Sequence, residues 1–64
     1  MNALGVKSFK ETVKAGDYLS VYTIPHKYMG TVEKVHDTWF TLTGDITTHI
    51  IDFNKIYAWH ILND

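Results

Sequence analysis

The sequence contains no cysteine, no arginine and a single proline, and each absence removes a class of protein or structure. Without cysteine there is no disulfide scaffold, no thiolate zinc site and no thiol nucleophile. Arginine is the side chain that most often reads guanine and grips phosphate in sequence-specific DNA readers, so a dedicated DNA reader is not expected. The formal net charge is only −1, and six lysines are the basic side chains.

Long hydrophobic runs are missing as well. No segment approaches the ~20 apolar residues of a membrane-spanning helix, and residues 1–7 lack the apolar run and cleavage site of a signal peptide. We therefore expect a soluble, cytoplasmic protein that does not bind membranes. With 64 residues, the chain is predicted to form one small domain with a thin core, and such chains often gain stability by self-association.

What the sequence does contain is short runs of aromatic and β-branched residues separated by turn residues. Apolar and polar side chains alternate in these runs, as in strands with one buried face. We predict strands over residues 17–23, 28–35, 39–43, 47–52 and 57–62. Val32 and Val35 are three apart, which interrupts the alternation and predicts a bulge near Lys34. Gly30 falls where a strongly bent strand needs a residue without a side chain.

The face of the last predicted strand that meets the core is left open by the pattern. Tyr57, Trp59 and Ile61 alternate with Ala58 and His60, so the two sets lie on opposite faces. Either set can be the inner one. High aromatic content in so small a chain means that some aromatic side chains must face outward.

One short helix is predicted near the N-terminus. Ser8 followed by Glu11 matches a capping box, which favours one or two helical turns over residues 9–14. The alternative interpretation is that residues 14–17 are only the turn that leads into the first strand.

These elements together predict an all-β fold. Five short strands at intervals of about ten residues, with two-residue turns between the middle ones, are typical of a small sheet that closes on itself. A tight 3₁₀-type turn is expected at residues 53–56, between the last two strands. The chain is thus predicted to be a single domain over residues 1–64, a five-stranded, strongly bent small barrel with a short N-terminal helix.

The order of the segments resembles a known family. A short helix is followed by Lys-Ala-Gly-Asp-Tyr-Leu-Ser-Val at residues 14–21, a bent strand at 29–35 and a strand–turn–strand at 50–61. Residues 8–62 thereby resemble the Sm-like family, which includes the bacterial Hfq-type proteins, and more broadly the SH3-like small barrels. The resemblance implies a ring-forming oligomer that binds RNA. Bacterial members carry Tyr/Phe-Lys-His before the last strand, whereas Phe53-Asn54-Lys55 lacks the histidine, so uridine specificity is not carried over.

Nucleic-acid binding is the first functional hypothesis. Small barrels of this kind bind single strands by stacking bases on exposed aromatic rings while lysines follow the phosphates. We predict a non-catalytic module that binds RNA or single-stranded nucleic acid through Tyr22, Lys27, Tyr28 and Lys55. We also expect a homo-oligomer, paired through its last two strands, with an interface that includes Ile50, Tyr57 and Trp59.

The second hypothesis is a protein–protein interaction adaptor or inhibitor, of the kind that phages and mobile elements encode. Tyr and Trp are enriched at interface hot spots, and an exposed edge strand can accept a strand from another chain. Catalysis is not expected, because no serine lies in a nucleophile motif such as Gly-x-Ser-x-Gly. No cofactor or metal is expected either, because the four histidines lack His-x-x-x-His or comparable spacing.

Overall fold

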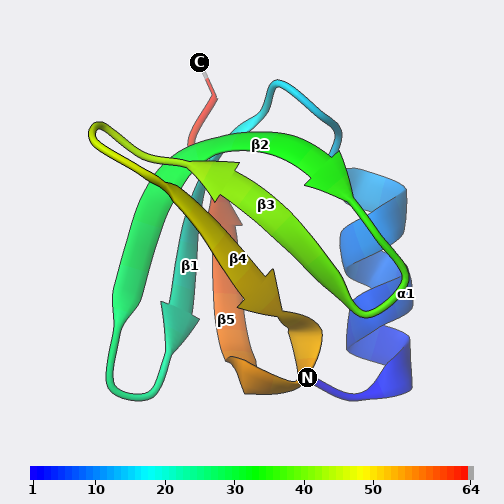
Figure 1. Ribbon diagram of the computed structural model, residues 1–64. Helices are drawn as coiled ribbons and strands as arrows, with labels where there is room; N and C mark the ends of the chain where they lie inside the picture. Colours follow the sequence, from blue (N-terminus) through cyan, green and yellow to red (C-terminus); the bar gives the residue numbers. More distant parts are fainter. Residues whose placement is uncertain (64) are drawn as a thin grey trace.

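The computed structural model describes residues 1–63 and shows one α-helix and five strands (Figure 1). The elements are, in chain order, α1 (Ala3–Thr12), β1 (Tyr18–Thr23), β2 (Lys27–Val35), β3 (Trp39–Thr43), β4 (Thr48–Asp52), the 3₁₀ turn η1 (Phe53–Lys55) and β5 (Ile56–Ile61). All strands belong to one antiparallel sheet in the order β4-β3-β2-β1-β5. The chain therefore meanders from β1 to β4, and β5 then returns to pair with β1.

The predicted strands are confirmed to within one residue at each end. The turns between β2 and β3 and between β3 and β4 are tight: the N–H of His36 donates to the carbonyl of Trp39, and that of Gly44 to Thr47, both at 2.8 Å. Figure 1 shows β2 curving strongly along its length. Among residues 1–63, β4 and β5 do not pair with each other, so the bent sheet is not closed by hydrogen bonds and keeps two edges.

Two irregularities in β2 allow this curvature, and both were predicted. The pairing register with β3 shifts between Val32 and Lys34, which is the expected bulge. Gly30 lies where β3 ends close to β2, because a Cβ atom at this position would stand 2.4 Å from the carbonyl oxygen of Thr43. No side chain fits there without separating the two strands.

The hydrophobic core lies between α1 and the inner face of the sheet. Its buried members come from α1 and the residue after it, from all five strands and from η1: Phe9, Val13, Leu19, Val21, Val32, Phe40, Leu42, Ile51, Phe53 and Ile56. Phe9 is at the centre, with ring centroids 4.8 Å from Phe40, 5.2 Å from Phe53 and 5.3 Å from Trp59. One helical side chain therefore joins α1 to β3, η1 and β5.

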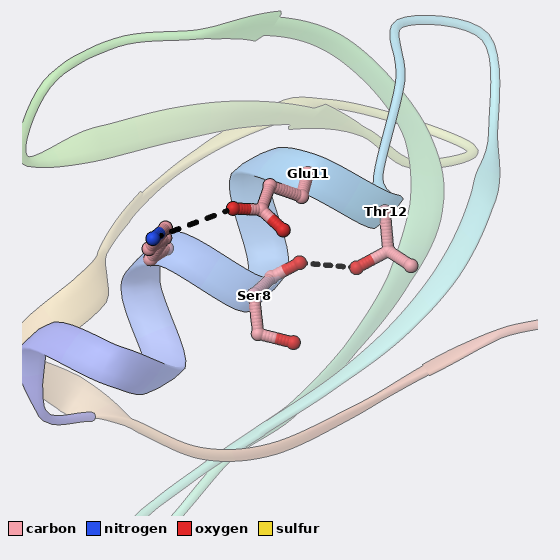
Figure 2. A network of polar contacts seen from close by, with 4 residues as sticks. Ser8, Glu11 and Thr12 are labelled. Carbon is pink, nitrogen blue, oxygen red and sulfur yellow. Dashed lines mark hydrogen bonds and ion pairs between the residues drawn. The ribbon is translucent and has the colours of Figure 1, made fainter.

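The predicted start of the helix is wrong. The helix α1 begins at Ala3 instead of residue 9, because the Asn2 side chain accepts a 2.8 Å hydrogen bond from the N–H of Gly5 and caps it. Ser8 is inside the helix, where its carbonyl accepts the Thr12 hydroxyl, and Glu11 forms a 4.0 Å ion pair with Lys7 (Figure 2). In the part of the chain that the structure describes, no helix has the length and apolar character to cross a membrane.

The segment between α1 and β1 is a turn, as the alternative interpretation had it. The N–H of Asp17 donates to the carbonyl of Lys14 at 3.0 Å, and Gly16 adopts a φ of 97° that favours glycine. The Lys14 N–H and the Asn63 side chain both donate to the Asp17 carboxylate, which holds the pKa of Asp17 below its ordinary value. Asn63 also accepts from the N–H of Tyr18, so this turn ties the end of the chain to β1.

A register shift decides which residues of β5 face the core. Trp59 pairs with Val21 and Ile61 with Leu19, so both lie on the inner face. The pairing with β1 then shifts between Tyr22 and Thr23, and Tyr57 leaves the inner face. Its side chain is 65% exposed. Tyr57 therefore does not share the inner face with Trp59 and Ile61, as simple alternation would require.

Candidate binding surface

The four predicted binding residues lie at one end of the molecule. Tyr22 and Lys27 face each other across the β1–β2 hairpin. Lys55 belongs to η1 and shares a pocket with Tyr28. Figure 1 shows the β1–β2 hairpin and η1 at the lower end of the view. Within that end the residues divide into two groups, which we call the outer aromatic group and the Tyr28 pocket.

The outer aromatic group consists of Tyr22, Lys27 and Tyr57. Tyr22 alternates with the buried residues of β1, so its ring is on the outer face of the sheet. The Lys27 ammonium lies 5.3 Å from the centroid of this ring, and the Tyr57 ring lies 6.2 Å from it at a 42° tilt. The Ser20 hydroxyl and, to a smaller degree, the Lys27 charge hold the pKa of Tyr22 below its usual value.

The Tyr28 pocket is a cavity of about 130 Å³ between the start of β2, the end of β4 and η1. Its walls are Thr23, Tyr28, Ile50, Ile51, Asp52 and Lys55. The Tyr28 ring packs against His49, with ring centroids 4.8 Å apart. The pocket therefore combines an aromatic ring and two isoleucines with one carboxylate and one ammonium group.

Hydrogen bonds occupy some of the polar atoms of the pocket. The Thr23 hydroxyl donates to the carbonyl of His26 at 2.9 Å. One carboxylate oxygen of Asp52 accepts from the N–H of Asn54 at 2.8 Å, which caps η1. Among residues 1–63, neither the second Asp52 oxygen nor the Lys55 ammonium has a hydrogen-bond partner. These two groups are available to a ligand.

The ion pairs of the protein lie elsewhere. Within the described chain they join Lys7 to Glu11 and Lys10 to Asp37, at 4.0 and 3.9 Å. Lys27 and Lys55 take part in neither pair. The end of the molecule that carries the exposed Tyr57 therefore also carries two lysines that form no ion pair within the described residues.

The predicted interface residues have different surroundings. Ile50 and Tyr57 are exposed, at 73% and 65%, on the edge strands β4 and β5. Trp59 is part of the core of its own chain, where its indole packs edge-on against Phe9. The backbone of Trp59 belongs to an edge strand, but its side chain does not lie on the outer surface with Tyr57.

Sequence reasoning missed Asp52 and His49. The predicted 3₁₀ turn at residues 53–56 was a signal for Asp52, since the residue before such a turn is well placed to cap it. No local signal pointed to His49, because only the curvature of the sheet brings β4 to Tyr28. Tyr57 was assigned to the interface, and the register shift adds it to the outer aromatic group.

Two further findings concern metal binding and similarity to known proteins. Among residues 1–63, no group of three or more histidine, aspartate or glutamate side chains is arranged to hold a metal ion. The chain matches no protein-family model, no curated protein and no solved structure.

Proposed function

We propose that this protein is a non-catalytic, Sm-like module that binds RNA or other single-stranded nucleic acid. The observation that carries the proposal is the outer aromatic group, in which an exposed Tyr57 ring lies beside the Tyr22–Lys27 pair. Bases of any sequence stack on such rings, and lysines follow the phosphates that connect them. In this proposal the protein is a bent small barrel, and the nucleic-acid strand binds at the end that carries the β1–β2 hairpin.

Binding in this proposal depends on contacts at the site and not on the net charge of the protein. Each stacked base contributes about 1–3 kcal/mol, so stacking on two tyrosines adds about 2–6 kcal/mol. The net charge of −1 supplies no general attraction for a polyanion. Affinity must therefore depend on the few lysines at the site, because phosphate binding is driven by the release of counterions at contacted phosphates.

Replacing Lys27 and Lys55 with alanine together is expected to flatten the salt dependence of binding. Each lysine that contacts a phosphate of a single strand contributes about 0.7 to the slope of log K against log salt concentration. The slope for a fluorescent single strand of about 12 nucleotides, followed by anisotropy from low to high salt, should fall by about 1.4 in the double variant. Lys7→Ala is the control, because Lys7 is already paired with Glu11 on α1.

Unchanged slopes in the double variant would place the binding surface elsewhere. Retention of a single strand at high salt by the unmodified protein would exclude a phosphate-driven mechanism. Tyr22→Phe separates stacking from hydroxyl chemistry, since it keeps the ring and should keep the affinity that Tyr22→Ala loses.

We also propose that the protein assembles head to tail, with β4 of one copy pairing with β5 of the next. Both strands have an unpaired edge within the described chain, and they lie at opposite ends of one sheet. Such pairing is heterologous, and heterologous contacts that close generate rings. Ile50 and Tyr57 supply exposed apolar area on the two edge strands.

Sedimentation at micromolar concentration tests the assembly. The unmodified protein should sediment as an oligomer, and Ile50→Lys should shift it to the monomer because a charge on an edge strand opposes pairing. Ile46→Lys is the matched control, since Ile46 is 98% exposed but lies in the turn before β4. A stable monomer of the unmodified protein would contradict the proposal. Ile50 also lines the Tyr28 pocket, so this variant is not used to measure ligand binding.

A protein-interaction role is the second candidate. Two isoleucines favour it, because Ile24 and Ile46 protrude from the tips of hairpins with 86% and 98% of their surface exposed. Residues that bind a partner lie disproportionately on loops held by a rigid scaffold. This role predicts no salt-sensitive retention of nucleic acid and the recovery of one stoichiometric protein partner, lost in an Ile24→Ser, Ile46→Ser double variant.

A further inference from the structure

We infer that the Tyr28 pocket is a guanine-selective base site. The inference rests on the proposed function, since it assumes that a single strand reaches this end of the molecule. It goes further by assigning one base of the strand to a particular cavity. Three features of the cavity support the inference: its size, its apolar walls and its two charged groups, Asp52 and Lys55.

The size and walls of the cavity suit one nucleobase. Pockets for drug-sized ligands usually enclose about 300–1,000 Å³, and this one encloses about 130 Å³. That volume suits a single planar ring system. The Tyr28 ring supplies an aromatic wall, and Ile50 and Ile51 supply apolar ones. Unstacked bases in RNA–protein complexes are commonly held between walls of this kind and read along their Watson–Crick edge.

The polar groups of the pocket define which edge is recognised. A carboxylate only accepts hydrogen bonds, and an ammonium only donates them. The capping bond uses one lone pair of one Asp52 oxygen, so both oxygens can still accept, and Lys55 has used none of its three donors within residues 1–63. A matching base must therefore present donors to Asp52 and, on the same edge, an acceptor to one N–H of Lys55, which leaves the other N–H groups of Lys55 for a phosphate.

Guanine satisfies this requirement better than the other bases. Its Watson–Crick edge carries two adjacent donors, N1–H and the 2-amino group, next to the O6 acceptor. Adenine and cytosine each present one amino donor beside a ring-nitrogen acceptor, which would face the carboxylate unfavourably. Uracil has one N–H between two carbonyl oxygens, and the carboxylate repels both. A well-formed bidentate contact discriminates between bases by about 5- to 150-fold.

Asp52 is also the one acidic residue of the pocket. Removing its charge is therefore expected to have opposite effects on strands with and without guanine. Its negative charge weakens contact with phosphates and strengthens contact with guanine. Asp52→Asn should therefore lower affinity for a strand that contains guanine while maintaining or raising affinity for strands without it. The substitution keeps the cap of η1, because asparagine caps helical turns as well as aspartate does.

The experiment compares four fluorescent uridine-rich strands of about 12 nucleotides that differ at one central position, occupied by G, A, C or U. With the unmodified protein, the G strand should bind about 5- to 150-fold more tightly than the U strand. Inosine at the same position, which lacks the 2-amino group, should bind with intermediate affinity. Asp52→Asn should abolish the preference, with unchanged circular dichroism and melting temperature as the test of folding.

Asp45→Asn is the matched control, because it removes the same charge from the turn between β3 and β4, outside the pocket. A preference lost equally in both variants would assign it to overall charge and overturn the inference. Equal affinities for all four strands would overturn the guanine site and leave nucleic-acid binding intact. Failure to bind any strand would overturn the proposed function itself, and the guanine site with it.

Discussion

Gly30→Ala is expected to lower the free energy of unfolding by about 3 kcal/mol, out of the ~3–10 kcal/mol typical of a chain with 64 residues. The added Cβ would lie 2.4 Å from the carbonyl oxygen and 2.8 Å from the carbonyl carbon of Thr43. Both are backbone atoms of β3, next to the Thr31–Thr43 pair that joins β3 to β2. They cannot rotate away as a flexible side chain would, so β2 and β3 must separate.

Urea unfolding followed by tryptophan fluorescence measures this effect. Gly44→Ala is the matched control, because the nearest atom to its added Cβ, the carbonyl oxygen of Thr47, is 3.4 Å away. That distance is an ordinary contact, and Gly44 does not have a positive φ. The urea midpoint of Gly44→Ala should stay close to that of the unmodified protein. Equal losses in the two variants would show that the close approach of β2 and β3 is not the cause.

Phe9→Ala is expected to cost about 3–5 kcal/mol, the range for truncating a buried aromatic side chain. Phe9 is fully buried and contacts three other aromatic rings, those of Phe40, Phe53 and Trp59. Truncation leaves a cavity between α1 and the sheet that these rings cannot fill, since each is held by its own strand or turn. The helix then loses its main attachment, because Phe9 is its only fully buried residue.

Thermal and urea unfolding measure the loss, and the emission maximum of Trp59, measured in a Trp39→Phe background because the chain has two tryptophans, reports on the cavity. Leu4→Ala on the same helix is the control, because Leu4 is exposed and surface substitutions usually change stability by less than ~0.5 kcal/mol. If Phe9→Ala does not fold, Phe9→Leu should still fold and show a smaller loss. Losses of equal size for Phe9→Ala and Leu4→Ala would contradict the central position of Phe9.

The strands of this protein were predictable because their signals are local. Alternation of apolar and polar residues places one face of a strand inward, and the interrupted spacing of Val32 and Val35 marks the bulge wherever the rest of the chain lies. Gly30 was recognised as a bending point for the same reason. The helix start was missed because Asn2 and Ser8 are both acceptable capping residues. Capping at Asn2 lets the helix run on through Phe9, the residue that enters the core.

The chemistry of the candidate site was partly predictable. Aromatic rings and lysines suggest single-strand binding wherever they occur on a surface, so Tyr22, Lys27, Tyr28 and Lys55 were identified by residue type. Their division into two groups was not predictable. It depends on which face of its strand each residue occupies and on how far the sheet bends, and both follow from contacts between residues that are distant in the chain.

The amino-acid sequence by itself determined where each strand lies, where the chain turns and which residue types are available for binding, because these properties depend on neighbours a few positions away. Only the tertiary structure decided that Tyr57 joins Tyr22 and that Asp52 shares a cavity with Tyr28 and Lys55. A one-residue register shift in β5 moves the Tyr57 side chain from the inner face of the sheet to the outer face. The bend of the sheet around Phe9 brings Asp52 and Lys55 close to Tyr28, and no local sequence pattern encodes how far the sheet bends.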